Sequence, residues 1–463
     1  MSLLPTIKTE DFAGLLGGAD YGEIFLEASE GASIRFEDSR VEDMGAVSER
    51  GMGLRFLRQA GGVETLQGST QELDAGTASR IRAGLFDKGE AAVQAPIRIG
   101  PPTAFRHPVR VEPFPIPLEE KISLLRRIDS AVRSEFPHIR QVSLSYGEGK
   151  REIVLLNSEG TFRREERTAV ILVVSVIAQR EGILQTGSAV IGALKGYELL
   201  TDTEPLQKAR QAAARAVAKL SAPKARAGEM PIVIAASAGG TFVHEAIGHS
   251  LEVDHVQEGS SPAYKGKLGQ AVAPENITII DDPTLPFYRG SFRFDDEGME
   301  ARPTAVVKSG ILCDYLYDRV TAMKEGKASN GHGRRESFHC RPIPRMSNLY
   351  IAPGKDDPRE ILKGLKAGIL VTHMGGGQVN TATGEFVFEV DEGYWVEDGS
   401  VRHMVRDANL LGIGPEILKS IDRVGWDMGW GIGTCGKDGQ GVPVSDGQPT
   451  IRIPKILIGG RHE

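Results

Sequence analysis

In the stretch His244-Glu245-Ala246-Ile247-Gly248-His249, two imidazoles and one carboxylate occur within six residues. The apolar run 231–236 and the pair Gly239-Gly240 precede it. Two histidines around a glutamate are typical of metal hydrolases, in which the imidazoles bind zinc and the carboxylate takes a proton from zinc-bound water. The stretch therefore predicts a zinc-binding helix with Glu245 as its base.

The histidine spacing differs from the usual form H-E-x-x-H, in which the histidines stand four positions apart on one helix face. Here His249 stands five positions after His244. At about 100° per residue, five steps place the second imidazole roughly 140° from the first, whereas four steps leave about 40°. One wide turn that takes up an extra residue would realign the rings, and such turns cluster at functional sites. Gly248 relaxes the backbone where this turn is needed.

The whole chain has the size and composition of a soluble globular protein with about two large domains. It has 463 residues, of which 40% are hydrophobic and 25% are charged. The net charge is -7, from 55 basic and 62 acidic residues, and no long basic block occurs. Because phosphate neutralisation needs a face rich in Lys and Arg, this balance argues against nucleic-acid binding.

The cysteines and the hydropathy pattern indicate the cellular compartment. Cys313, Cys340 and Cys435 are too few for a disulfide framework, which suits a reducing cytoplasm. Residues 1–8 have neither a basic leader nor a sustained apolar core, so we expect no signal peptide. No stretch approaches the roughly eighteen apolar residues of a membrane span. The sequence predicts a soluble, cytoplasmic protein.

Apolar periodicity predicts mixed structure in the first half of the chain. Strand-like runs fill residues 21–70, and the β-branched run 170–178 predicts a further strand. Helices are predicted within 70–86, over 118–136 and over 204–220. Residues 221–229 carry Pro, Gly and charge without periodicity, which is typical of a linker.

The second half contains many short β-like runs separated by glycines, and one helix is predicted over 415–424. We therefore predict an α+β fold with two domains. Residues 1–225 form an N-terminal α/β sandwich-like domain. Residues 226–463 form a C-terminal, mainly β catalytic domain that carries the zinc-binding helix.

A catalytic zinc usually takes three protein ligands, so one more is needed. Cys435 lies among glycines that let the backbone approach an ion, and Lys437 would favour its thiolate. Cys313, in a strand-like run, is expected to be an inert packed thiol. Glu252 is an awkward ligand because it follows His249 by only three residues. The other candidates are His255, His332, His339, Cys340, His373 and His403.

Three further motifs have more ordinary interpretations. Gly375-Gly376-Gly377 lacks the ending of a phosphate-binding loop and is interpreted as a turn flanking a strand. Asp295-Asp296-Glu297 lacks EF-hand spacing and is interpreted as a surface turn. His332, Arg334 and Arg335 could hold a substrate carboxylate, or could form salt bridges in an exposed loop.

Several long motifs occur together in one order. The chain resembles the TldD/PmbA family of metallopeptidases, specifically its catalytic TldD-like branch, over nearly its whole length. The segments that carry this resemblance are VHEAIGHSLE (243–252), DDEG (295–298), GHGRRES (331–337), GGGQVN (375–380), TGEF (383–386) and residues 433–440.

In that family the HExxxH helix supplies two zinc ligands and the base, and a cysteine near the C-terminus supplies the third ligand. The resemblance implies that His244, His249 and Cys435 hold one zinc ion per chain and that Glu245 is the base. It implies zinc-dependent hydrolysis of peptide bonds in unfolded proteins or small peptides. Family members work as homodimers or as heterodimers with a PmbA-like subunit. The alternative is a non-catalytic scaffold or regulatory partner in a TldD/PmbA complex.

Overall fold

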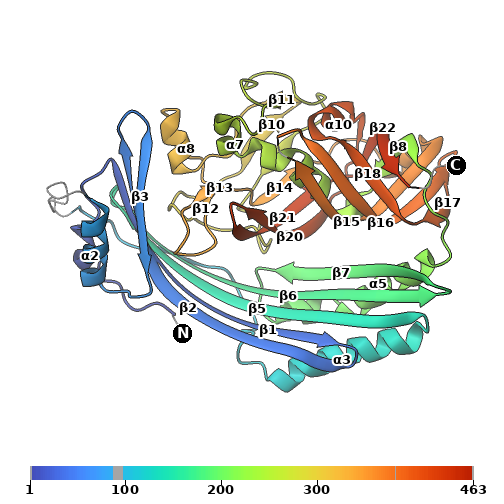
Figure 1. Ribbon diagram of the computed structural model, residues 1–463, viewed down its shortest axis with the longest axis horizontal. Helices are drawn as coiled ribbons and strands as arrows, with labels where there is room; N and C mark the ends of the chain where they lie inside the picture. Colours follow the sequence, from blue (N-terminus) through green and yellow to red (C-terminus); the bar gives the residue numbers. More distant parts are fainter. Residues whose placement is uncertain (1–2, 87–96, 381, 461–463) are drawn as a thin grey trace.

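The computed structural model describes residues 3–86, 97–380 and 382–460 of the chain. It is a mixed α/β structure that is rich in strands, as the sequence predicts. A long curved sheet from the first half lies along one side, and the strands of the second half lie against it (Figure 1). Among the helices of these residues, none is long and apolar enough to cross a membrane.

The long sheet contains seven strands. From one edge they are β3 (Val63–Thr70), β2 (Arg40–Gln59), β1 (Tyr21–Glu37), β5 (Ile139–Asn157) and β6 (Phe162–Arg180), with β4 (Thr103–Arg106) and β7 (Ile183–Ala193) both paired to β6. All pairings are antiparallel except that of β4 with β6. Val170, Leu172 and Val174 of β6 are buried at every second position, as expected of a strand with one face on a core.

Two helices pack on this sheet. α3 (Leu118–Glu135) and α5 (Pro205–Lys219) contact each other and share one apolar core with β5, β6 and β7. Ile122, Leu125 and Ile128 recur at helical spacing on α3 and are buried there, which confirms the predicted helix. Three shorter helices in the described part of the first half are α1 (Thr9–Ala13), α2 (Ala75–Leu85) and α4 (Glu198–Asp202).

A six-stranded sheet lies in the second half of the chain. Across it the order is β11 (Ile311–Leu312), β10 (Thr304–Lys308), β9 (Ile279–Asp281), β14 (Asn348–Ile351), β21 (Gln440–Gln448) and β20 (Gly429–Lys437). A separate pair joins β12 (Gly333–Arg334) to β13 (Ile343–Pro344). β20 and β21 form a hairpin, and β20 is one of the two edge strands of its sheet.

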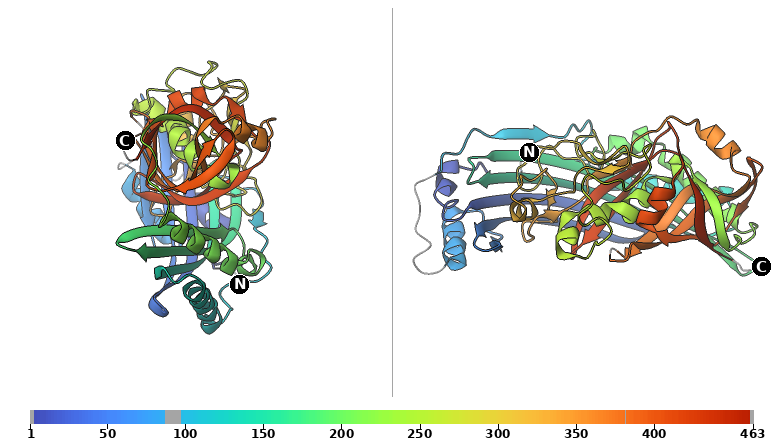
Figure 2. Two further views of the ribbon diagram at one scale, coloured as in Figure 1. Left: turned by 90° about the vertical axis from the view of Figure 1, so that its right-hand side faces the viewer. Right: turned by 90° about the horizontal axis from the view of Figure 1, so that it is seen from above.

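The remaining strands of the second half form a barrel. Around it run β15 (Ala367–Asn380), β8 (Gly228–Ile234), β22 (Ile451–Gly459), β18 (Ala408–Ile413) and β16 (Glu385–Glu397). β16 pairs back to β15, which closes the sheet on itself, as the left view of Figure 2 shows. β17 (Ser400–Val405) is added to β16, and β19 (Arg423–Val424) to β22.

The segment with the paired histidines packs between the barrel and the six-stranded sheet. It consists of η1 (Ala236–Ala238), α6 (Thr241–Val243), η2 (His244–Gly248) and η3 (His249–Leu251), and α7 (Val253–Glu258) follows. Phe242 packs edge-on against Phe386 and Phe388 of the barrel, and Leu349 of β14 belongs to the same core. The other helices of this half are α8 (Arg319–Lys324), α9 (Pro358–Lys363) and α10 (Gly414–Ser420).

The apolar cores follow the two halves of the chain. Two cores use residues within 4–220, and the largest uses residues within 225–458. A small cluster joins Phe338 to Phe25, Ile153 and Leu155 of the long sheet. The division into two domains at residue 225 stays a prediction.

Candidate metal centre

A wide turn of π type spans His244–Gly248. Such a turn takes up one more residue than an α-helical turn, which is what a histidine spacing of five requires. The ring centroids of His244 and His249 lie 5.1 Å apart, with the ring planes at 85°. The wide turn predicted from the spacing is therefore present, and it brings both rings to one side.

Gly248 is needed for close packing rather than for backbone freedom. Its φ of -55° and ψ of -53° are those of an ordinary helix. A Cβ atom added there would lie 2.1 Å from the sulfur of Met346 and 2.8 Å from Cδ2 of Leu349. The predicted role of Gly248 in relaxing the backbone is wrong, because the constraint comes from neighbours about a hundred residues further along the chain.

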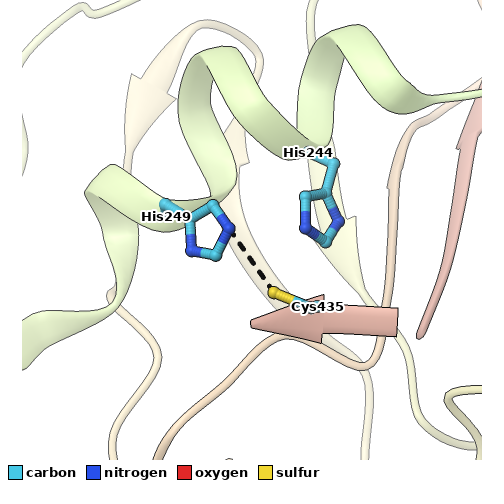
Figure 3. Close-up of side chains that lie close together, drawn as sticks. All are labelled: His244, His249 and Cys435. Atoms are coloured by element: carbon cyan, nitrogen blue, oxygen red, sulfur yellow. Dashed lines mark hydrogen bonds between the residues drawn. The ribbon is translucent and has the colours of Figure 1, made fainter. Parts of the chain in front are cut away.

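Cys435 lies opposite the two histidines on β20 (Figure 3). Its Sγ is 3.4 Å from Nε2 of His249. The ligand atoms of His244, His249 and Cys435 all lie within 4.8 Å of one another. The structure thus brings together the three residues that the sequence and the resemblance assign to zinc.

The geometry and the donor types of this cluster fit a zinc ion. With Zn–S and Zn–N bonds of about 2.3 and 2.05 Å in a tetrahedral site, a sulfur and a nitrogen ligand lie about 3.5 Å apart. The 3.4 Å between Sγ of Cys435 and Nε2 of His249 is close to that value. Nδ1 of His244 is buried and has no hydrogen-bond partner among the described residues. Two imidazoles and a thiolate are ligands that suit zinc.

The members of the cluster change one another's charge. Burial raises the pKa of the Cys435 thiol, but the neighbouring imidazoles of His244 and His249 together outweigh burial and lower that pKa to about 5. Burial lowers the pKa of His249, but the Glu252 carboxylate and Cys435 together outweigh burial and raise that pKa. The histidines therefore favour the thiolate, which is the metal-binding form of cysteine.

Glu245 adjoins the cluster. Its Oε2 lies 3.9 Å from Nε2 of His249, and 22% of its side chain is exposed. Burial raises the pKa of the Glu245 carboxyl. A carboxylate with a raised pKa accepts a proton more readily, which suits a base acting on water beside the metal ligands.

A cleft of about 650 Å³ opens at the cluster. Besides the cluster it is lined by Thr241, Glu245, Gln378, Val379, Ile432, Thr434 and Asp446. Gln378 and Val379 belong to the part of β15 beyond residues 369–371, which pair with β8. The cleft is thus lined by the paired-histidine helix, by the β20–β21 hairpin and by the end of β15.

Charged residues outside the predicted set surround the ligands. Glu252 lies behind His249, with its Oε2 3.0 Å from Nδ1 of the ring. Lys437 binds the carboxylates of Glu252 and Asp254 at 3.2 and 2.7 Å, so the histidines rather than this lysine favour the thiolate. The one sequence signal for this arrangement is the position of Lys437, two residues after Cys435.

The other candidate ligands lie outside the cluster of His244, His249 and Cys435. Cys313, predicted to be packed, is exposed, and Cys340 is partly buried. Nε2 of His332 lies 3.0 Å from the hydroxyl of Thr304. His255 lines the cleft but contacts Ser260 through Nδ1.

Two motifs predicted as turns belong to the packed structure. Asp295, Asp296 and Glu297 are buried, and Glu297 binds Arg55 of β2 at 2.6 Å. Gly375-Gly376-Gly377 lies inside β15, where its register with β16 shifts. Residues 295–298 do turn, with the N–H of Gly298 bonded to the carbonyl of Asp295, but the turn is buried, so only its predicted place at the surface is wrong. The prediction of a turn at residues 375–377 is wrong, because this segment stays within β15 and its Gly377 pairs with Phe388 of β16.

Two histidines and a cysteine beside a carboxylate, on a strand-rich α/β fold, define the class of this site as a candidate hydrolytic metal centre. Three family models cover most of the chain. PmbA/TldA metallopeptidase domain 1 matches residues 22–94, the central domain matches 111–220 and the C-terminal domain matches 227–460. The chain therefore belongs to the PmbA/TldA metallopeptidase family, which confirms the TldD/PmbA resemblance.

Individual relatives extend this assignment. A metalloprotease TldD homolog of Haemophilus influenzae is 34% identical over 457 residues, covering 96% of this chain and 93% of the relative. Among solved structures, a candidate modulator of DNA gyrase from Thermotoga maritima has a TM-score of 0.78 at 21% identity, covering 95% of this chain and 96% of that one. TldE from Thermococcus kodakarensis has a TM-score of 0.71 at 17% identity, covering 96% and 97%. The two structures show a shared fold, and the named relatives support a metallopeptidase.

Proposed function

We propose that this chain is a zinc-dependent metallopeptidase that hydrolyses peptide bonds in unfolded proteins or small peptides. The observation that carries the proposal is the convergence of His244, His249 and Cys435 beside Glu245 in one cleft. The two histidines and the cysteine would hold one zinc ion per chain. When bound, zinc supplies a Lewis acid and lowers the pKa of water from about 15.7 to about 7.

Glu245 carries the proton in the proposed reaction. Its carboxylate takes a proton from the attacking water as the water oxygen bonds to the scissile carbonyl carbon. The resulting carboxyl then gives that proton to the leaving amine nitrogen as the carbon–nitrogen bond breaks. The partial exposure of Glu245 within the cleft supports this role, because the side chain must meet both water and substrate.

An extended backbone is the substrate shape that the cleft favours. β20 carries Cys435 and is an edge strand of its sheet, so its outer edge can pair with an added strand. Pairing of this kind uses backbone hydrogen bonds and tolerates many side-chain sequences. A segment inside a folded domain has its backbone groups already paired. The proposed substrates are therefore unfolded proteins and small peptides.

We also propose that the chain works in the cytoplasm as a homodimer or with a PmbA-like subunit. Its likeness to TldE supports a partner of the same architecture. Light scattering after size-exclusion chromatography, on the chain alone and on its mixture with a PmbA-like chain, distinguishes the two assemblies. A monomer in both samples would contradict the proposal.

Zinc content and peptide cleavage, measured on the same preparations, test the catalytic proposal. The purified chain, alone and with a PmbA-like subunit, is compared with Glu245→Gln and Cys435→Ser. Cys313→Ser is the matched control, because this exposed thiol lies outside the cleft. We expect Glu245→Gln to keep zinc and to lose about 10²- to 10⁴-fold of its cleavage rate. Cys435→Ser should lose zinc, and Cys313→Ser should match the wild type.

Two results would contradict the proposal. Full cleavage by Glu245→Gln would remove the base. A wild-type chain that holds no zinc and cleaves no peptide, with or without the partner, would favour the scaffold role.

A further inference from the structure

The side chain of Glu252 is fully buried beside the candidate metal centre and has four charged or ionisable partners, which are His249, His255, Arg345 and Lys437. Its Oε2 lies 3.0 Å from Nδ1 of His249 and 3.2 Å from Nζ of Lys437. Its Oε1 lies 3.8 Å from Nε of Arg345, which is also fully buried. A buried carboxylate costs free energy unless it is paired with positive groups. The loss of one of these partners would therefore leave the charge of Glu252 less well compensated.

On the helix side, Glu252 determines how His249 meets a metal. A carboxylate at Nδ1 favours the tautomer with its proton on that nitrogen, which leaves the lone pair on Nε2. Nε2 is the atom that lies 3.4 Å from Sγ of Cys435. Carboxylates placed behind metal-binding imidazoles fix the ring orientation and make the free nitrogen more basic.

On the strand side, the same carboxylate holds the segment that carries Cys435. Arg345 donates hydrogen bonds to the backbone carbonyls of Cys435 and Gln440, the latter at 3.1 Å. Lys437 stands two residues after Cys435 on β20 and also binds the backbone carbonyl of Pro344 at 3.0 Å. Both cations that border Glu252 therefore reach the β20–β21 hairpin.

We infer that Glu252 is a positioning residue that assembles the metal site from its two parts. It orients the ring of His249 and, through Lys437 and Arg345, fixes the strand that brings the thiolate from 186 residues away. Glu252 itself does not bind the metal. This role rests on metal binding at the proposed site, and it differs from the roles of the three ligands and of the base Glu245.

Zinc affinity and the cobalt spectrum test this inference. Zinc affinity is measured by competition with a chromophoric chelator, for the wild type, Glu252→Gln and Glu252→Ala. Glu258→Gln is the matched control, because Glu258 is an exposed glutamate on the adjoining helix α7. We expect zinc to bind about 10-fold more weakly to Glu252→Gln and about 100-fold more weakly to Glu252→Ala. Glu258→Gln should bind zinc as the wild type does.

Cobalt distinguishes positioning from a merely structural role. We expect Glu252→Ala, saturated with Co²⁺, to show a weaker thiolate-to-cobalt absorption band per bound ion, because the sulfur and the ring are no longer aligned. A structural role alone would lower the Tm of the metal-free protein and leave the cobalt spectrum and zinc affinity unchanged. Lys437→Met keeps the carboxylate and releases the strand, so it should weaken zinc binding even if Glu252→Ala fails to fold.

The outcomes separate this inference from the proposed function. A wild-type chain that binds no zinc would overturn both. Wild-type zinc affinity in folded Glu252→Gln and Lys437→Met, beside a wild-type chain that does bind zinc, would overturn the positioning role alone.

Discussion

At the scale of single residues, Asp74 and Asp318 show how the surroundings of an aspartate at a helix N-terminus change its pKa. Each accepts a hydrogen bond from a backbone N–H in the first turn of its helix. Hydrogen bonds from Thr77 lower the pKa of Asp74 at the surface. Burial raises the pKa of Asp318 to about 7, and the Glu297 carboxylate acts in the same direction. The same cap therefore carries a charge at neutral pH in α2 and is half protonated in α8.

We expect Asp318→Asn to stabilise the protein increasingly as the pH rises from 4 to 7. A carboxyl whose folded pKa exceeds its unfolded value of about 3.9 binds its proton more tightly in the folded state. Its contribution to stability is complete below pH 4 and is lost as the pH rises through 7. Asparagine keeps an acceptor for the N–H of Thr321 but cannot ionise. Thermal unfolding between pH 4 and 8 should give a Tm difference that grows to about pH 7 and then levels off.

Asp74→Asn is the control variant, and we expect its effect on the Tm to have the opposite sign. Because the pKa of Asp74 is lowered, its stabilisation is present above the unfolded pKa and is lost as the pH falls. This variant should lower the Tm near pH 7 and have little effect near pH 3. A Tm difference between Asp318→Asn and the wild type that stays constant from pH 4 to pH 8 would contradict the raised pKa of Asp318.

How much of the candidate site the sequence predicts depends on how local its parts are. His244, Glu245 and His249 are predictable because they lie within one helix, and their spacing even predicts the wide turn. Cys435 is one candidate among several until the resemblance selects it. The contacts of Glu252 with Arg345 and Lys437 join distant segments, and no spacing rule contains them.

At the scale of elements, the wide turn η2 packs against Met346 and against Leu349 of the six-stranded sheet at Gly248, which has no side chain. We expect Gly248→Ala to lower the free energy of unfolding by about 1–3 kcal/mol, because its Cβ would collide with Met346. The displacement of the turn should also weaken zinc binding, since His249 follows directly. Urea unfolding and chelator competition measure the two effects.

Met346→Ala supplies the matched test of that collision. Alone, it leaves a cavity in the core. Combined with Gly248→Ala, it gives the new methyl group the space of the lost sulfur, so the double variant should lose less stability than the two single losses added together. Additive losses would show that the collision with Met346 is not the cause.

The elements themselves are predicted unequally well. α3 and α5 occur within two residues of their predicted bounds. The apolar residues of α3 recur with the helical period, and α5 is rich in the helix-forming residues Ala, Lys and Arg. The closure of the barrel depends on β16 pairing with β15, and a strand period says nothing about which strands pair. For the same reason the sequence does not show that β20, which carries Cys435, is an edge strand of its sheet.

At the scale of the whole molecule, a network of buried charges joins the long sheet to the second half of the chain. Arg55 of β2 binds Glu23 of β1 at 2.9 Å and Glu297 at 2.6 Å, and Arg335 also binds Glu23. At most 2% of each of these side chains is exposed. Glu297 and Arg335 belong to segments that the sequence places equally well at the surface, because their partners lie 242 and 312 residues away.

We expect Arg55→Met to lower the free energy of unfolding by about 3–5 kcal/mol, because Glu23 and Glu297 would remain buried with one fewer cation. Arg359→Met is the matched control, since the Arg359–Asp357 pair is 82% exposed on the arginine side and such pairs contribute about 0–1 kcal/mol. In Arg55→Met with Glu297→Met, the remaining Glu23–Arg335 pair is balanced in charge, so part of the loss should be recovered. Calorimetric unfolding of the four proteins measures these differences. Equal Tm values for Arg55→Met and Arg359→Met would show that the two halves of the chain hold together without this network.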